Sequence, residues 1–150
     1  MRLEEEIQQS KFKDQYHKLG VNLIYSAAWM SSINLKALKP FNLSIQQFNI
    51  LRILKGRHPE PATVKLLTER MIDKMSNASR LVEKLKQKGL VERSSCPEDR
   101  RQVDIAITEK GIEVVSTASE IAEKEIKNSL TNLTKSEAKQ LNELLDKMRG

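Results

Sequence analysis

Apolar residues recur every three or four positions along most of this chain, which is the spacing of amphipathic helices. The first such stretch covers residues 8–38 and ends before Pro40, which cannot continue a helix. Its apolar side is formed by Phe12, Tyr16, Leu19, Leu23, Ala27, Met30 and Leu38. A second helix is predicted from Ser44, which forms a capping-box pattern with Gln47, to about Gly56.

The loop "GRHPEPAT" separates this helix from two shorter ones, because its prolines bias the preceding residues away from helix. The pattern predicts one short helix over about residues 63–71, with Thr63 as its N-cap. A second is predicted from Asp73, another good N-cap, to Lys88. Gly89 follows at the position where a left-handed residue commonly ends a helix.

The segments "LVER" and "VDIAI" alternate apolar and polar residues and are predicted strands, joined by a loop too long for a tight turn. Two more helices follow, the first capped by Thr108 and the second by Thr134 with Glu137. Two short helices joined by a tight turn and followed by a hairpin are the parts of a winged helix-turn-helix.

We therefore expect a mainly α fold with a small β-hairpin wing, in which a winged helix-turn-helix unit is flanked by terminal dimerisation helices. The expected parts of this one intertwined domain are the N-terminal dimerisation helix 1–40, the winged helix-turn-helix region 41–108, and the C-terminal dimerisation helices 109–150. Wide apolar stripes on the terminal helices need a cover, so a homodimer is favoured over a monomeric bundle.

Composition and charge limit the classes of molecule that this protein is expected to bind. The chain carries 26 Lys and Arg against 20 Asp and Glu, and residues 70–101 alone have a net charge of +4. A clustered basic surface is typical of proteins that bind polyanions, although a solvated basic face is the commoner cause of any single charge run. The acidic start "MRLEEEIQQS" differs from a signal peptide, and one cysteine cannot form an internal disulfide, so a reduced, cytoplasmic protein is expected.

One predicted helix face combines small polar residues with cations. In "MSNASRLVEKLKQKGL", Ser76 and Asn77 stand at the N-terminal end of the helix, and Arg80 and Lys84 follow along its body. Serine and asparagine can read base edges in the major groove, while arginine and lysine reach bases or phosphates. A plain surface helix would explain the lysines and Glu83 but not this order, so we expect a DNA-reading helix.

The loop "CPEDRRQVDI" places the like charges of Arg100 and Arg101 side by side. If the preceding helix lies in the major groove, this loop can extend over the DNA backbone and insert an arginine into the minor groove, where narrow A·T-rich segments concentrate negative potential. The pattern does not tell which arginine enters. Asp99 is expected to support the wing by holding one of the arginines or a nearby amide.

These motifs, in this order, closely resemble the core of MarR-family transcription regulators. The features that carry the resemblance are "SRLVEKL", "KGLVER", the wing "PEDRR" and "ITEKG". The resemblance implies a transcription regulator that binds a pseudo-palindromic double-stranded DNA operator as a dimer, with Ser79 among the residues at the DNA. It also implies a repressor relieved by a small aromatic or anionic effector bound between the two regions, where Tyr16, Tyr25, Trp29 and Phe48 are the candidate pocket residues.

Other functions fit the residues less well. We find no nucleophile with a base, no phosphate-binding glycine loop and no metal-ligand cluster, so no enzyme, cofactor or metal site is expected. Cations surround Cys96, yet a redox role for this wing thiol is not favoured. A non-sequence-specific chromosome-associated protein and a winged-helix protein-interaction module stay open as alternatives, and the ratio of specific to random DNA affinity separates the first from a regulator.

Overall fold

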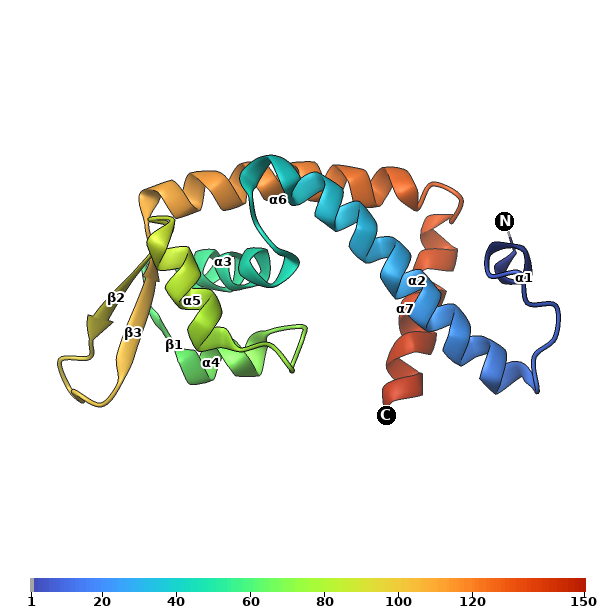
Figure 1. Ribbon diagram of the computed structural model, residues 1–150, viewed down its shortest axis with the longest axis horizontal. Coiled ribbons are helices and arrows are strands. Elements are labelled where there is room, and N and C mark those ends of the chain that lie inside the picture. Colours follow the sequence, from blue (N-terminus) through green and yellow to red (C-terminus); the bar gives the residue numbers. More distant parts are fainter. Residues whose placement is uncertain (1) are drawn as a thin grey trace.

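The computed structural model describes residues 2–150 and is mainly helical, with one small sheet (Figure 1). In chain order the elements are α1 (Leu3–Glu6), α2 (Gln15–Leu38), the 3₁₀ helix η1 (Lys39–Phe41), α3 (Ile45–Arg57), β1 (Ala62–Thr63), α4 (Val64–Arg70), α5 (Ala78–Gln87), β2 (Val91–Ser95), β3 (Val103–Ile107), α6 (Glu109–Ser129) and α7 (Lys135–Arg149). Helix α6 runs along the top of Figure 1, the sheet and short helices lie under one end of it, and α2 descends toward the other end, where α1, α7 and both termini lie. The mainly helical winged fold with flanking terminal helices is confirmed.

Side-chain caps fix the start of most helices, because a cap satisfies one of the backbone N–H groups left free in the first turn. Four predicted caps are confirmed, each accepting a hydrogen bond from the amide three residues further on: Ser44 of α3, Thr63 of α4, Thr108 of α6 and Thr134 of α7. The left-handed Gly89, with φ of 72°, follows the end of α5 as predicted.

The first long helix begins later than predicted. Residues from 8 onward were expected in it, but α2 starts at Gln15 because the Asp14 carboxylate accepts a hydrogen bond of 2.8 Å from the amide of His17 and caps the helix there. The chain before it forms the separate short helix α1. A 2.5 Å ion pair between Glu4 and Lys18 joins α1 to α2.

The helix predicted from Asp73 also begins later, at Ala78. Asn77 is its N-cap and accepts a hydrogen bond of 3.0 Å from the amide of Arg80. Asp73 instead closes a turn by accepting a hydrogen bond of 3.0 Å from the amide of Met75. Both residue types cap helices well, so the sequence pattern did not separate a cap from a turn.

The predicted hairpin is part of a three-stranded antiparallel sheet in the order β1-β3-β2. Strands β2 and β3 pair from Val91 opposite Ile107 to Ser95 opposite Val103. The third strand, β1, was not predicted, because its two residues are too few to show alternation, and it lies in the segment expected to be a loop. It anchors the hairpin to the helices beside it.

The core occupies the winged helix-turn-helix half and the adjoining part of α6. Its fully buried side chains come from the end of α2, from α3, α4 and α5, from the sheet and from α6, and include Leu38, Ile50, Leu51, Leu54, Leu67, Leu85, Ile105 and Val115. The small residues Ala118 and Ala122 of α6 are also buried, on the helix against which α2 packs. The long helix α6 therefore belongs to both halves of the molecule.

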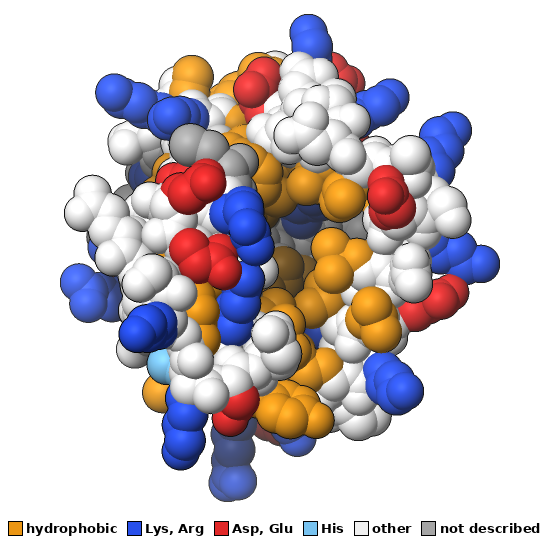
Figure 2. Space-filling view, turned by 90° about the vertical axis from the view of Figure 1, so that its right-hand side faces the viewer, with side chains coloured by type: hydrophobic (Ala, Val, Ile, Leu, Met, Phe, Trp, Pro, Cys, Tyr) orange, Lys and Arg blue, Asp and Glu red, His pale blue; other side chains and the backbone are white. Residues whose placement is uncertain are grey.

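The apolar side of the terminal helices remains largely exposed. Only Ala37 and Leu38 of α2 are buried, and α7 has no buried residue. Figure 2, which faces this end of the molecule, shows apolar side chains gathered around a hollow. A groove of about 440 Å³ between α2 and α7 is lined by Leu19, Asn22, Leu23, Ser26, Leu141, Leu144, Leu145 and Met148. An apolar surface of this kind is typical of a protein interface.

The first turn of α6 provides a test of this packing. A Cβ atom at Gly111 would lie 2.2 Å from the carbonyl oxygen of Leu90 and 2.8 Å from a side-chain carbon of Ile107. Gly111→Ala should therefore lower the free energy of unfolding by about 1–3 kcal/mol, although alanine favours helix more than glycine. In the control Gly56→Ala, the added Cβ meets no atom within 4 Å, and stability should stay equal or rise by about 0.5–1 kcal/mol. Urea unfolding measures both, and equal stability of the two variants would contradict the packing described here.

Candidate nucleic-acid interface

Helix α5 presents a polar and basic face to solvent. Ala78, Val82 and Leu85 on its other face are buried in the core. Packing of these apolar side chains against the neighbouring helices turns Arg80 and Lys84 outward, and both are exposed. Ser79 on the first turn is exposed as well. The side of the helix predicted to read DNA is thus accessible.

Arg80 and Lys84 border a shallow groove of about 360 Å³ beside the N-terminal end of α5. Its lining comes from α3, α5 and the turn between α4 and α5, and consists of Gln46, Asp73, Ser76, Asn77, Arg80, Leu81 and Lys84. Neither cation forms an ion pair within residues 2–150, where the salt bridges involve other side chains. Their charges are therefore available to a polyanion.

Ser76 and Asn77 lie in the turn before α5 and not within the helix, as the late start of α5 requires. The Asn77 side-chain oxygen is engaged in capping. The pKa of the Asp73 carboxyl is lowered by hydrogen bonds, first from the Met75 amide and then from the side chains of Gln46 and Ser76. Both predicted base-reading residues thus also hold the local structure, which stiffens the entry into α5.

The tip of the hairpin, residues 96–102, is closed by its own hydrogen bonds. The amide of Arg101 donates to the Asp99 carboxylate at 2.9 Å, and the amide of Gln102 donates to the Asp99 carbonyl at the same distance. Of the two contacts expected of Asp99, the structure has the backbone amide and not a guanidinium. Arg100 and Arg101 are exposed and form no ion pair with any of residues 2–150.

The hairpin is also tied to α5. Arg93 of β2 pairs with Glu83 of α5 at 3.1 Å, so these charges support the position of the wing and are not free for a ligand. In Figure 1 the hairpin tip, α4 and the turn before α5 lie along the lower edge of this half of the molecule. The unpaired cations thus belong to two elements, α5 and the tip of the β2–β3 hairpin, and Figure 1 shows the arrangement of these elements.

Within one chain, the four aromatic residues predicted to line an effector pocket do not share one cavity, and their role in ligand binding stays a prediction. Tyr16 is 86% exposed near the start of α2, while Phe48 of α3 is buried in the hydrophobic core of the protein. Tyr25 and Trp29 share a shallow pocket with α1, in which the Tyr25 hydroxyl donates to Glu6 at 2.8 Å. A helix rises only about 1.5 Å per residue, so positions 16 and 29 of one helix lie about 20 Å apart.

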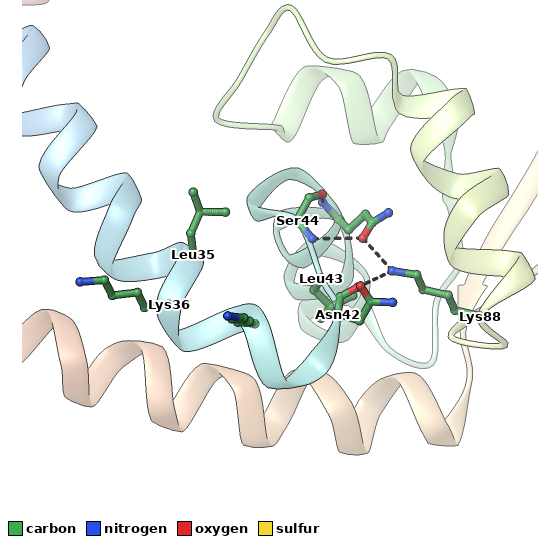
Figure 3. A pocket seen from close by; sticks show the side chains of 8 residues that line it. Leu35, Lys36, Asn42, Leu43, Ser44 and Lys88 are labelled. Carbon is green, nitrogen blue, oxygen red and sulfur yellow. Dashed lines mark hydrogen bonds between the residues drawn. The ribbon is translucent and has the colours of Figure 1, made fainter.

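The structure contains a lysine-rich groove that the sequence pattern did not indicate, because its residues come from separate elements (Figure 3). It has a volume of about 520 Å³, and its lining consists of Leu35, Lys36, Lys39, Asn42, Leu43, Ser44, Gln47 and Lys88. The ammonium group of Lys88, the residue that ends α5, donates to the carbonyl of Asn42 and to the side-chain oxygen of Gln47 at 3.2 Å. Lys88 therefore links the end of α5 to the connection between α2 and α3.

Two further features bear on the class of the protein. No helix within residues 2–150 is long and apolar enough to cross a membrane. The same residues contain no group of three or more His, Cys, Asp or Glu placed to hold a metal ion.

Helices α4 and α5 with the β2–β3 hairpin form a winged helix-turn-helix, a class of DNA-binding domain. A family model described as the MarR family matches residues 43–103. The regulator MgrA of Staphylococcus aureus is 32% identical over 113 residues, which cover 75% of this chain and 74% of MgrA. The chain belongs to the MarR family of DNA-binding transcription regulators, a non-enzymatic family.

Other relatives agree with this assignment. The transcriptional repressor IacR of Pseudomonas putida is 26% identical over 111 residues, which cover 74% of this chain but only 65% of the length of IacR. The organohalide-sensing regulator RdhR-CbdbA1625, solved with bound 2,4-dichlorophenol, is 25% identical with a TM-score of 0.84, and the match covers 94% of this chain and 85% of that chain. Escherichia coli MarR, at 23% identity, a TM-score of 0.69 and coverage of 87% of this chain and 96% of that chain, shares the fold.

Proposed function

We propose that this regulator is a homodimer that binds a pseudo-palindromic operator and represses transcription until a small ligand weakens DNA binding. The observation that carries the proposal is that two elements expose basic side chains. Helix α5 carries Arg80 and Lys84, and the hairpin tip carries Arg100 and Arg101. These cations have no ion-pair partner within residues 2–150. Other cations, such as Arg93, are paired within the fold.

In this proposal α5 enters the major groove from its N-terminal end. Ser76, Asn77 and Ser79 face base edges, and Arg80 and Lys84 reach bases or phosphates. One wing arginine enters the minor groove, whose width and potential attract arginine, and Asp99 keeps the tip in shape through the Arg101 amide. Residues 41–108 then form the DNA-binding region.

Residues 1–40 and 109–150 are proposed to form the dimer interface. The support is the apolar groove between α2 and α7, together with large exposed side chains such as Leu19, Leu144 and Met148 on the same helices. A second copy would cover these surfaces and place two α5 helices for the two half-sites of one operator.

The effector is proposed to be a small aromatic anion that binds the lysine-rich groove of Figure 3. Lys36 and Lys39 supply positive charge there, Leu35 is 51% exposed at the rim, and no acidic residue is among the lining residues. The related RdhR-CbdbA1625 was solved with a chlorophenol. An anion that draws Lys88 away from Asn42 and Gln47 would release the end of α5 from the rest of the molecule.

The dimer can be tested without DNA. Light scattering should give about twice the chain mass of 17.2 kDa at micromolar concentration. Leu144→Asp with Met148→Asp should shift the protein toward monomer, because charges would then replace apolar contacts. Ile72→Asp, at a more exposed position outside the terminal helices, is the control and should stay dimeric. A wild type that remains monomeric would contradict the interface.

The two basic elements should respond differently to substitution. Arg80→Ala should weaken operator binding by about 1–3 kcal/mol and relax sequence preference, because the major groove carries the distinctive base code. Arg100→Ala with Arg101→Ala should weaken binding to all duplexes, most where flanks are A·T-rich, and should flatten the dependence on log salt by about 0.9 per lost phosphate contact.

Titration of one operator with A·T-rich or G·C-rich flanks, at several salt concentrations, measures these effects. Lys124→Ala with Lys127→Ala removes the same charge from the far end of α6 and should change little. If the wing variant behaves as wild type, the wing does not contact DNA. If wild type binds random and selected duplexes equally, the protein is a non-specific DNA-coating protein instead.

The effector groove is tested with benzoate and 2,4-dichlorophenol as probes. Each should release the wild type from its operator, and Lys36→Gln with Lys39→Gln should raise the required concentration about tenfold, because a charge-assisted contact is lost. Operator affinity without probe should stay within about twofold of wild type, since these lysines are not placed at the DNA. Failure of both probes, or an unchanged response of the variant, would contradict this site.

A further inference from the structure

Two large apolar side chains stand apart from the proposed dimer surface. Met75, 92% exposed, and Ile72, 87% exposed, are the most exposed large hydrophobic residues of the described chain. Both lie in the turn between α4 and α5. The other exposed large hydrophobic residues all belong to the terminal helices and their connection, namely Tyr16, Leu19, Ile24, Trp29, Leu35, Ile121, Leu133, Leu141, Leu144 and Met148. The proposed dimer interface therefore does not explain why Ile72 and Met75 are exposed.

The turn that carries Met75 is held in one shape. The Asp73 carboxylate accepts hydrogen bonds from the Met75 amide at 3.0 Å and from the Gln46 side chain at 3.5 Å. The amide of Ser76 donates to the Asp73 carbonyl at 3.2 Å. Since these bonds fix the backbone on both sides of Met75, its side chain is held outward before any partner binds. Preorganisation of this kind lowers the cost of binding.

The same bonds reduce what the polar residues of the turn can offer. The Asn77 side-chain oxygen caps α5, and the Ser76 amide donates to the Asp73 carbonyl. At the N-terminal end of α5, the exposed apolar group without a structural task is the thioether chain of Met75. The cations Lys74 and Arg80 stand on either side of it in the sequence, and both are exposed.

Met75 adjoins the proposed DNA surface in the sequence and is flanked by positive charge, so DNA is the partner that fits its exposed side chain. A major groove against this end of α5 presents polar atoms, with one apolar exception, the C5 methyl group of thymine. Methionine is unbranched and polarizable, so it adapts to a small apolar partner. We propose that Met75 is a specificity-determining residue that contacts the methyl group of a thymine in each half of the operator. This inference rests on the proposed function, because it requires α5 to lie in the major groove.

Replacement of thymine by 2′-deoxyuridine tests the contact, because it removes only the methyl group and keeps every hydrogen-bonding atom. Operator duplexes are first selected from random DNA with wild-type protein, and each thymine is then replaced singly. Wild type should lose about three- to tenfold in affinity at one thymine of each half-site, the effect expected from burial of one methyl group.

Met75→Gln keeps the length of the side chain but makes its end polar, and it should bind thymine and uracil operators equally at that position. Met75→Leu is the matched apolar control and should keep most of the preference. Each comparison is a ratio within one variant, so a general change in affinity does not affect it. Because Met75 is almost fully exposed, these variants should fold as wild type does.

The outcomes separate the inference from the proposed function. A wild type that prefers its operator but is indifferent to every thymine replacement overturns the role of Met75 alone. The same holds if Met75→Gln loses as much affinity on uracil operators as wild type does. A wild type without any sequence preference overturns the proposed function and, with it, this inference.

Discussion

Close packing on one side of α6 holds the two halves of the molecule together. Gly111 leaves the first turn of this helix in contact with the carbonyl of Leu90, where a Cβ atom would not fit. Further along, the small residues Ala118 and Ala122 are buried, and α2 packs against the same helix. The winged helix-turn-helix half and the terminal helices thus share α6 as a support, and both pack closely against it.

Charge is distributed so that structural and available cations are separate. Arg93 is paired with Glu83 and ties the wing to α5, and Arg52 is paired with Glu123 between α3 and α6. Arg80, Lys84 and the wing arginines lack such partners within residues 2–150. A polyanion therefore meets cations that need not give up an internal contact, on projections whose positions the paired cations help to maintain.

The connection between α2 and α3 lies next to the parts of the molecule that are proposed to bind DNA, to bind the ligand and to form the dimer. Lys88 at the end of α5 donates to Asn42 and to the side chain of Gln47, which also accepts from the Ser44 amide in the capping box of α3. The end of α5 is thereby joined to the segment that follows the long terminal helix α2. A ligand in the adjacent groove and a partner on the terminal helices would act on neighbouring parts of one hydrogen-bonded structure.

The sequence by itself determined the order of the helices, most of their caps, the hairpin and the basic face of α5, because helical spacing, capping residues and alternation are local properties. It also determined the family through motifs around Arg80 and the wing. Only the tertiary structure decided where α5 begins, since Asp73 and Asn77 cap helices equally well and the surrounding contacts chose between a turn and a cap. It alone decided that β1 joins the sheet, that Tyr16 and Phe48 lie apart, and that Lys36, Lys39 and Lys88 share one groove. Each of these depends on packing between residues distant in the chain, which no local pattern records.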